Sequence, residues 1–291
     1  MIMGILNRTP DSFSDGGLFI DEGAALSRIE GMLSEGADLI DIGAESTRPG
    51  APPVSDEEQI ARIGASVREA ARLGAMVSID TTSPVVAGRA LAEGAAVVNS
   101  VSLDAAGALG ALCARHGAAL VLMHCRGSMA AMSGFSAYPD DAYDDVVEDV
   151  AREWSAAAER AMAAGLAREE LILDPGLGFT KNARHSLELC ARLDELCALG
   201  FPVLVGPSRK SFLARAAAVA RGSHTPPVAR LGGSVAAALA CASRGAAMVR
   251  VHDVAAVRQA LAVAEAIEAA RRPGRPARAE APAEVGARAD A

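Results

Sequence analysis

The sequence predicts an α/β fold, a single (β/α)8 barrel of the TIM class. Short apolar runs rich in Val, Ile and Leu recur along the chain and alternate with stretches of helical periodicity. Continuously apolar strands that alternate with helices indicate a parallel sheet buried on both faces. The chain has 291 residues, and a barrel of this class typically needs about 250 residues. Eight strand-and-helix units therefore favour closure into a barrel over an open doubly wound sheet.

The predicted elements follow one another in a regular order. The eight predicted strands cover residues 2–6, 39–42, 76–79, 97–98, 119–123, 171–173, 203–205 and 248–251. Apolar residues between them recur at the spacing of a helix face, most clearly at Ala25, Leu26, Ile29, Met32 and Leu33 and at Val254, Val257, Leu261 and Ala264. After residue 270 this periodicity is lost and Pro, Gly and charge increase. We therefore predict one barrel domain over residues 1–271 and a disordered tail over residues 272–291.

The composition excludes several classes of protein. Apolar residues make up 51% of the chain and aromatic residues only 3%, so Ala, Val, Leu and Ile must fill the core. The formal net charge of −8 argues against a nucleic-acid partner, because phosphate backbones are held by basic faces. The sequence shows neither a signal peptide nor an unbroken apolar run of about 18 residues, so we expect no membrane partner. The five cysteines form no CxxC pair, which predicts a soluble protein of the reducing cytoplasm.

A polar side chain stands at or just after the end of every predicted strand. These residues are Asn7, Asp41, Asp80, Asn99, His124, Asp174, Ser208 with Arg209 and Lys210, and Arg250 with His252, together with Glu45, Thr47 and Arg48 after the second strand. A single Asn or Asp after a strand is commonly a helix cap or a turn former. The βα loops at the carboxyl face of a barrel build its active site, so eight such positions predict one shared mouth.

Two groups of side chains at this mouth indicate what it binds. In an acidic protein, positive charge concentrates at one set of positions, which suits a phosphate or diphosphate. These positions are Arg48, Arg209, Lys210, Arg250 and His252. Asp80, Asn99 and Asp174 offer acceptors for the amino and ring N–H groups of a planar heterocycle. We therefore expect a site that holds a heterocycle deep in the barrel and an anion nearer the rim.

Other features favour structural roles. His124 follows an apolar strand, so we expect a hydrogen-bonded barrel histidine rather than a catalyst. An acidic run ahead of Trp154 predicts a solvated helix face without a metal site. Its members are Asp140, Asp141, Asp144, Asp145, Glu148 and Asp149. The sequence has no HExxH or GxSxG motif and no GxGxxG motif after a strand, so we expect a transfer that depends on positioning and leaving-group stabilisation.

Eight stretches between residues 3 and 254 form a specific combination of motifs. They read GILNRTPDSFSDGG, ESTRPGA, SIDTTSP, VNSVS, MHCRG, LDPGLGFTK, GPSRKSF and RVHDV. In this combination the chain resembles the dihydropteroate synthase family, pterin-binding (β/α)8 barrels of folate biosynthesis that are the target of sulfonamides. The resemblance implies a transferase that joins p-aminobenzoate to 6-hydroxymethyl-7,8-dihydropterin diphosphate with the help of Mg2+. The products are 7,8-dihydropteroate and pyrophosphate, and the family commonly forms homodimers.

The resemblance also implies a role for each residue of the mouth. It assigns the pterin to Asp80, Asn99, Asp174 and Lys210, the diphosphate to Asn7, Thr47, Arg48, Arg250 and His252, Mg2+ to Asn7, and the p-aminobenzoate pocket to Phe13, Pro49, Phe179 and Ser208. In the implied mechanism the C–O bond breaks early, and the catalytic residues are Asp80, Lys210 and Arg250. Asp80 stabilises the positive charge left on the pterin methylene. The arylamine has a free lone pair and needs no protein base, and loops carrying Phe13 and Pro49 close over the complex.

The chain departs from the family pattern at a few positions. Arg8 stands where the family usually has a small apolar residue, and we expect its side chain to point to solvent. Four further residues, expected to alter local geometry but not the reaction, are Ser100, Thr180, Ser186 and Met129, in place of Asp, Gly, Asn and Pro. The chain also begins almost at its first strand, without the family's short leader, so we expect the natural start to lie upstream.

Two alternatives remain open at this stage. A pterin-dependent methyltransferase barrel of the corrinoid type shares the pterin pocket, but it has no need of ESTRPGA or of the run from Ser208 to Lys210. A non-catalytic pterin-binding paralogue is supported by Arg8 and Ser100 alone. An assay of pyrophosphate release separates all three functions.

Overall fold

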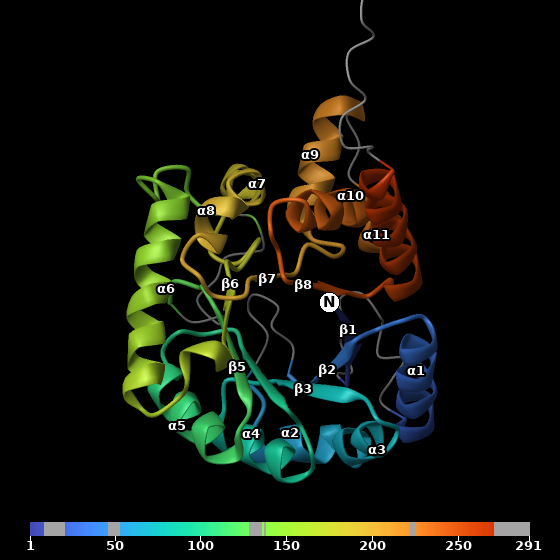
Figure 1. Cartoon of the computed structure of the whole chain (residues 1–291), viewed down its shortest axis with the longest axis vertical. Helices are drawn as coiled ribbons and strands as arrows, with labels where there is room; N and C mark the ends of the chain where they lie inside the picture. Colours follow the sequence, from blue (N-terminus) through green and yellow to red (C-terminus); the bar gives the residue numbers. More distant parts are fainter. Residues whose placement is uncertain (9–20, 46–52, 128–135, 137, 222–224, 271–291) are drawn as a thin grey trace, which may run out of the picture.

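The structure is a computed structural model that describes residues 1–8, 21–45, 53–127, 136, 138–221 and 225–270. Within these residues, eight parallel strands form one sheet in the order β6-β5-β4-β3-β2-β1-β8-β7. A parallel bridge between Leu173 and Val203 joins the two ends of this order and closes the barrel. The helices surround the strands as an outer ring (Figure 1), so the predicted (β/α)8 barrel is confirmed.

All eight predicted strands are present with small changes at their ends. The strands are β1 (Ile2–Asn7), β2 (Leu39–Gly43), β3 (Met76–Asp80), β4 (Val97–Ser100), β5 (Ala119–Met123), β6 (Leu171–Asp174), β7 (Leu204–Val205) and β8 (Met248–Val251). Most of the changes extend a strand at its carboxyl end to include the first polar residue, as at Asn7, Asp80 and Asp174. Hydrogen bonding with neighbouring strands thus continues into the residues of the mouth.

The helices cover the outer face of the sheet. They are α1 (Glu22–Ser34), α2 (Asp56–Ile63), α3 (Ser66–Arg72), α4 (Pro84–Ala92), α5 (Ala106–His116), α6 (Val146–Ala163), α7 (Ala183–Ala191), α8 (Leu193–Cys197), α9 (Ser211–Arg221), α10 (Leu231–Ala242) and α11 (Val254–Ala269), with 3-10 turns at Arg168–Glu170 and Pro227–Ala229. The faces predicted for the first and last helices pack inward, since Ala25, Ile29 and Met32 are buried in α1, and Val254 and Val257 in α11. Side-chain caps mark several starts, such as Asp21 for α1 and Asp145 for α6.

The barrel interior is built in layers because strand side chains alternate between the two faces of the sheet. A layer of apolar side chains fills the floor, and it consists of Met3, Leu39, Val97, Val121, Ile172, Leu204 and Met248. Two positions further along four of these strands, on the same face, stand Asp41, Asn99, Asp174 and Arg250. The polar mouth therefore rests directly on a packed apolar floor.

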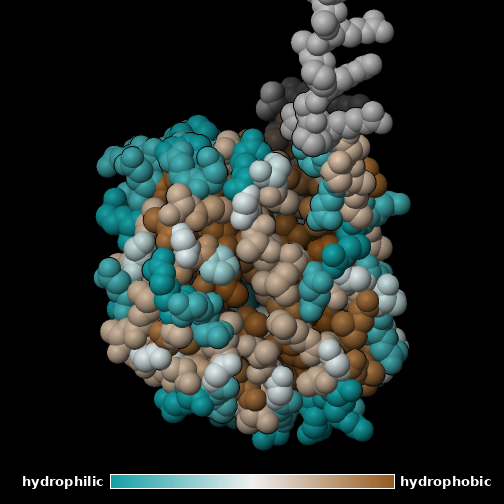
Figure 2. Space-filling model, in the orientation of Figure 1, coloured by the Kyte–Doolittle hydropathy of each residue, from teal (hydrophilic) through white to brown (hydrophobic). Residues whose placement is uncertain are grey.

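Figure 2 shows the face of the molecule on which the chain's amino terminus lies. Apolar side chains gather over the centre of this face, and hydrophilic side chains cover much of the surrounding periphery (Figure 2).

Among the described helices, none has the length and apolar character needed to cross a bilayer. All five cysteines lie in described parts of the chain and are free. The predicted tail lies outside the described residues, and the cytoplasmic location stays a prediction.

The acidic run differs from its predicted role as a solvated helix face. Helix α6 begins only at Val146, so the first members of the run precede the helix, and Asp145 is its N-cap. Asp149 is buried and its carboxylate pairs with Arg126 at 3.1 Å and with Arg152. The prediction was therefore wrong for Asp149, because a cation supplied by the segment after β5 reaches this side of the helix.

Close packing between α5 and α6 gives a test of the fold. A Cβ atom on Gly110 would lie 2.8 Å from Ala161 Cα and 2.9 Å from its carbonyl oxygen, whereas one on Gly107 would meet no atom closer than 3.8 Å. We expect Gly110→Ala to lower the free energy of unfolding by about 1–3 kcal/mol, because the two helices must separate. The control Gly107→Ala should raise it by about 0.5–1 kcal/mol through better helix propensity. Urea unfolding measures both, and equal effects would contradict the close helix contact.

Candidate active site

The carboxyl ends of the first four strands meet at one level. Asn7 pairs in register with Gly43, Gly43 with Asp80, and Asp80 with Asn99. A Cβ atom on Gly43 would lie 3.4 Å from Asp80 Cβ, so the glycine leaves room for the aspartate beside it. Strand register therefore brings Asn7, Asp80 and Asn99 together although they are far apart in the sequence.

Asp41 links three strands across the barrel mouth. Its Oδ2 atom accepts hydrogen bonds from Arg250 Nε at 2.6 Å and from Asn99 Nδ2 at 3.0 Å. The other arm of the guanidinium reaches β3, where Arg250 Nη2 donates to Asp80 Oδ2 at 2.8 Å. Asp41 is fully buried, and its Oδ1 atom has no hydrogen-bond partner among the described residues. This atom is therefore available to an N–H group of a ligand.

Asp41 was predicted to lie at the mouth without an assigned role. The available signal was a carboxylate at the middle of the apolar strand LIDIG, where an unpaired charge is costly. Only the structure shows that its partner is Arg250, 209 positions away in the sequence. The interaction could not be read from spacing because β2 and β8 are not neighbours in the sheet.

Burial changes the acid–base properties of this cluster. Burial raises the pKa of Asp80 to about 7, and the neighbouring Arg250 opposes that rise. Burial lowers the pKa of Arg250, but the contacts with Asp41 and Asp80 outweigh it and the net shift is upward. A permanent guanidinium is therefore clamped between two carboxylates, and one of them titrates near neutral pH.

The opposite side of the mouth is formed by β6 and β7. The Gly176 amide donates to Asp174 Oδ1 at 2.8 Å, and Lys210 Nζ donates to the Leu177 carbonyl at 2.6 Å. The Lys210 ammonium also lies 4.5 Å from the centre of the Phe179 ring. Burial raises the pKa of Asp174 and lowers that of Lys210 to about 8, while their mutual attraction opposes both shifts. Asp174, Lys210 and Phe179 thus lie on the same side of the mouth.

Ser208 and His252 form a hydrogen-bonded pair. The His252 backbone amide donates to Ser208 Oγ at 3.2 Å, and this hydroxyl lies 3.0 Å from His252 Nδ1. Burial, followed by the charge of Arg209, lowers the pKa of His252 well below its usual range, so the ring is neutral. If the hydroxyl donates to Nδ1, the ring proton is on Nε2. The Nε2–H group can then donate a hydrogen bond to a phosphate oxygen.

Arg209 is held by hydrogen bonds to residues that follow it in the sequence. Its backbone has φ of 57°, which is unusual for a residue with a side chain. Its guanidinium donates to both carboxylate oxygens of Asp253, at 3.1 and 2.7 Å, and its carbonyl accepts from Arg230 Nη1 at 2.7 Å. These bonds hold the turn between Ser208 and Lys210 in a strained conformation that presents both residues to the mouth.

A buried network beside β5 was not predicted as a unit. Lys181 Nζ lies 2.9 Å from His124 Nδ1, and His124 Nε2 lies 3.0 Å from Glu153 Oε2. Burial lowers the pKa of His124 to about 4 and that of Lys181 to about 7. The neutral imidazole accepts from the lysine and donates to the carboxylate, so the prediction of a hydrogen-bonded barrel histidine is confirmed.

Arg8 differs from its predicted position in solvent. It is 6% exposed, and its Nη1 atom donates to Ser66 Oγ at 2.8 Å, at the start of α3. Its backbone amide donates to the Gly43 carbonyl at 2.7 Å, which extends the β1–β2 ladder by one bond. The prediction was wrong because the long side chain packs between β1 and α3 instead of leaving the protein.

Three other departures from the family pattern have structural explanations. Thr180 has φ of 46°, a conformation that glycine adopts without strain. Ser186 Oγ accepts from the Gly178 amide at 3.0 Å, which holds the loop after β6, and Ser100 Oγ donates to the Ser102 carbonyl at 2.9 Å. Met129 lies outside the described residues.

Four predicted site residues also lie outside the described part of the chain. They are Phe13, Thr47, Arg48 and Pro49. The segment from residue 46 to 52 is flanked by a described contact, since the Val54 amide donates to Glu45 Oε1 at 3.1 Å. Gln59 Nε2 also donates to the Val54 carbonyl at 3.0 Å. The described residues on either side of this segment, Glu45 and Val54, are therefore held together.

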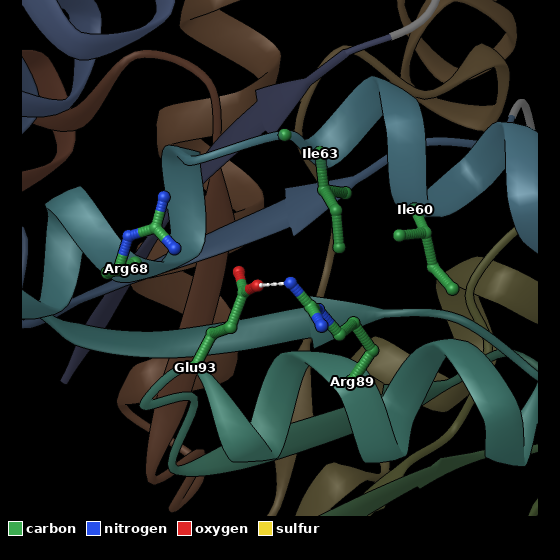
Figure 3. A pocket seen from close by; sticks show the side chains of 6 residues that line it. Ile60, Ile63, Arg68, Arg89 and Glu93 are labelled. Carbon is green, nitrogen blue, oxygen red and sulfur yellow. Dashed lines mark ion pairs between the residues drawn. The ribbon is translucent and has the colours of Figure 1, made fainter.

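A surface pocket of about 210 Å³ lies away from this mouth, between α2, α3 and α4. Ile60 and Ile63 line one side of it, and an ion pair between Arg89 and Glu93 at 2.5 Å lines the other (Figure 3). Its cation Arg89 is more than half exposed and already paired. The pocket therefore lacks the buried polar groups that distinguish the barrel mouth.

The fold and the mouth together define a class of protein, a TIM barrel with a buried polar cluster at its carboxyl face. The family model described as "Pterin binding enzyme" matches residues 3–252. A curated dihydropteroate synthase of Neisseria meningitidis serogroup B is 44% identical over 272 residues, which cover 91% of this chain and 92% of that protein. The chain belongs to the pterin-binding enzyme family.

Solved structures agree with this assignment. The Yersinia pestis dihydropteroate synthase in a sulfonamide complex is 39% identical, with a TM-score of 0.84 over 93% of this chain and 94% of that one. The Xanthomonas albilineans dihydropteroate synthase with 4-aminobenzoic acid is 40% identical, with a TM-score of 0.81 over 92% and 93% of the two chains. Similarity of sequence and of fold therefore extends over nearly the whole length.

The buried imidazole predicts how stability depends on pH. The folded-state pKa of His124 is lowered to about 4 from 6.5, so its contribution is complete above pH 6.5 and is lost as pH falls through 4. We expect the wild type to lose about 3 kcal/mol more than His124→Gln between these pH values. Urea unfolding at several pH values measures the difference. The control His116→Gln, at an exposed position, should follow the wild-type curve, and parallel curves for His124→Gln would contradict a neutral buried histidine.

Proposed function

We propose that the chain joins p-aminobenzoate to 6-hydroxymethyl-7,8-dihydropterin diphosphate, giving 7,8-dihydropteroate and pyrophosphate. The observation that carries the proposal is the buried cluster in which Arg250 is clamped by Asp41 and Asp80 beside Asn99. It combines acceptors for a flat N–H-rich ring with a cation for the leaving group. The dihydropteroate synthases of similar sequence support the same reaction.

We assign the pterin to the deep part of the mouth. Asp80, Asn99 and Asp174 are nearly buried and carry acceptor oxygens, and Lys210 lies beside Asp174. Two carboxylates with pKa values raised by burial prefer ligands that donate hydrogen bonds, as the amino group and ring nitrogens of a pterin do. The unpaired Oδ1 atom of Asp41 adds a further acceptor.

We assign the diphosphate to the side of the mouth formed by β8 and β1. Arg250 and a neutral His252 supply N–H donors there, and Asn7 lies at the carboxyl end of β1. The amide oxygen of Asn7 suits Mg2+, which usually takes one or two protein oxygens and completes its shell with phosphates and water. Bound Mg2+ neutralises negative charge on the diphosphate. Thr47 and Arg48 complete this proposed group.

The mechanism follows from the charges around the methylene carbon. As the C–O bond breaks, positive charge develops on the pterin and negative charge on the diphosphate. Asp80 has a pKa of about 7 before substrate arrives, and a neighbouring cation favours its ionised form. Arg250, held between two carboxylates, cannot move away with the leaving group. The p-aminobenzoate amine then attacks the methylene carbon from the side lined by Phe179 and Ser208 and loses one N–H proton to water as the new C–N bond forms. Phe13 and Pro49 complete that pocket.

The proposed reaction has a direct assay. We expect pyrophosphate release only when the dihydropterin diphosphate, p-aminobenzoate and Mg2+ are all present. Asp80→Ala and Lys210→Ala should each lower kcat/KM at least about tenfold, equivalent to about 1.4 kcal/mol, by removing charge next to the reacting pterin. Binding of the pterin without release would identify a non-catalytic binder, and full rates in both variants would contradict the site assignment.

We also propose that the protein is a homodimer. Helix α10 supports this, because it combines exposed Leu231 with the small exposed residues Gly232, Gly233 and Ala236, which lets a second helix approach closely. Sedimentation should give about twice the mass of one chain. Leu231→Glu should shift the protein to the monomer, whereas a wild type that sediments as a monomer at micromolar concentration would contradict the proposal.

A further inference from the structure

Lysine is rare in this chain, which uses arginine at almost every cationic position. Among the 28 Lys and Arg residues, only Lys181 and Lys210 are lysines. The proposed function uses Lys210 and gives Lys181 no role. An ammonium is a compact donor of three hydrogen bonds, whereas a guanidinium is planar and larger, so the two are not interchangeable in a buried space. Lys181 therefore occupies a position whose geometry calls for a compact donor of hydrogen bonds.

The surroundings of Lys181 match that description. The side chain is fully buried, and its Nζ atom lies 2.9 Å from His124 Nδ1, 3.2 Å from the His124 carbonyl and 3.1 Å from the Phe179 carbonyl. The number of acceptors, three, matches the number of N–H groups on an ammonium. A Cβ atom on Gly176 would lie 2.0 Å from the His124 carbonyl oxygen and 3.3 Å from Lys181 Nζ. The backbone is thus closed tightly around the ammonium.

These bonds connect the end of β5 to the loop after β6. One carbonyl belongs to His124 and the other to Phe179, 55 positions later in the sequence. The next residue is held from the same side, because Thr180 Oγ1 accepts from the Arg126 amide at 3.0 Å and its carbonyl from Tyr143 at 3.0 Å. The backbone around Phe179 is therefore fixed while its ring lies 4.5 Å from Lys210 Nζ.

We propose that Lys181 is a positioning residue for the p-aminobenzoate side of the mouth, whose ammonium holds the Phe179 backbone and so keeps the Phe179 ring against Lys210. The identity of the ligand rests on the proposed function, but the position of the ring does not. A flat ring held in place favours an aromatic second substrate, because the ring needs no reordering when that substrate binds.

A measurement without substrate tests the ring position. Protein labelled with 13C at lysine Cε gives one signal for each of the two lysines, and the Lys210 signal should be shifted upfield by the Phe179 ring. In Lys181→Met, which keeps the length of the side chain, we expect the Lys210 signal to move toward its position in Phe179→Leu. The control Trp154→Phe removes another buried donor, to the Leu122 carbonyl, and should leave the signal in place. An unchanged Lys210 signal in Lys181→Met would overturn the proposal.

Kinetics give a second readout that a general loss of stability would not imitate. We expect Lys181→Met to raise KM for p-aminobenzoate about tenfold, as loss of a charged hydrogen bond predicts, and KM for the pterin diphosphate less than about twofold. Lys181→Gln keeps a donor and should restore part of the difference. Equal increases in both KM values would overturn the proposal. A wild type without activity would contradict the proposed function and leave the lysine signals as the test of Lys181.

The wild-type protein also allows a test if the variants fail to fold. An ammonium with three acceptors should show Nζ protons protected from solvent exchange at pH 6, with nuclear Overhauser contacts to Phe179. Rapid exchange of both lysine ammonium groups, or Lys181 contacts that do not include Phe179, would overturn the proposal.

Discussion

The active site depends on one buried interaction, the clamp that Asp41 and Asp80 form around Arg250. Its bonds cross the barrel interior and join β2, β3 and β8. Asn99 on β4 donates a hydrogen bond to the carboxylate of Asp41. A buried cation without such partners would be very costly, and so would the two carboxylates without it. The polar groups of the mouth are therefore held in fixed positions, since each one is the hydrogen-bond or ion-pair partner of another.

Burial gives these groups their chemistry as well as their positions. Away from water, the pKa of Asp80 rises to about 7, that of Lys210 falls to about 8 and that of His124 falls to about 4. A neutral histidine can then serve as a link between Lys181 and Glu153 instead of adding a charge. The apolar floor below and the helices outside thus set which groups carry charge, although none of them touches the reacting atoms.

All eight strands and the level of the mouth could be predicted from the sequence, because short apolar runs and polar residues at strand ends are local patterns. Partners could not be predicted, because they depend on which strands face each other across the barrel. Arg8 illustrates the limit. Its charge predicted a side chain in solvent, yet the side chain is buried and donates a hydrogen bond to Ser66 at the start of α3. Asp149 is a second example. Its helical spacing predicted an exposed face, but its carboxylate is buried in an ion pair with Arg126.

The sequence by itself determined that this chain is a barrel of eight strand-and-helix units with polar residues at the carboxyl end of each strand. It did so because apolar periodicity and turn chemistry act over a few residues at a time. Tertiary structure alone decided that Asp41 pairs with Arg250, that His124 is neutral and that Lys181 holds Phe179. Those outcomes depend on contacts between residues that are far apart in the sequence and on the exclusion of water from around them. Neither condition is met until the strands have closed around a common axis.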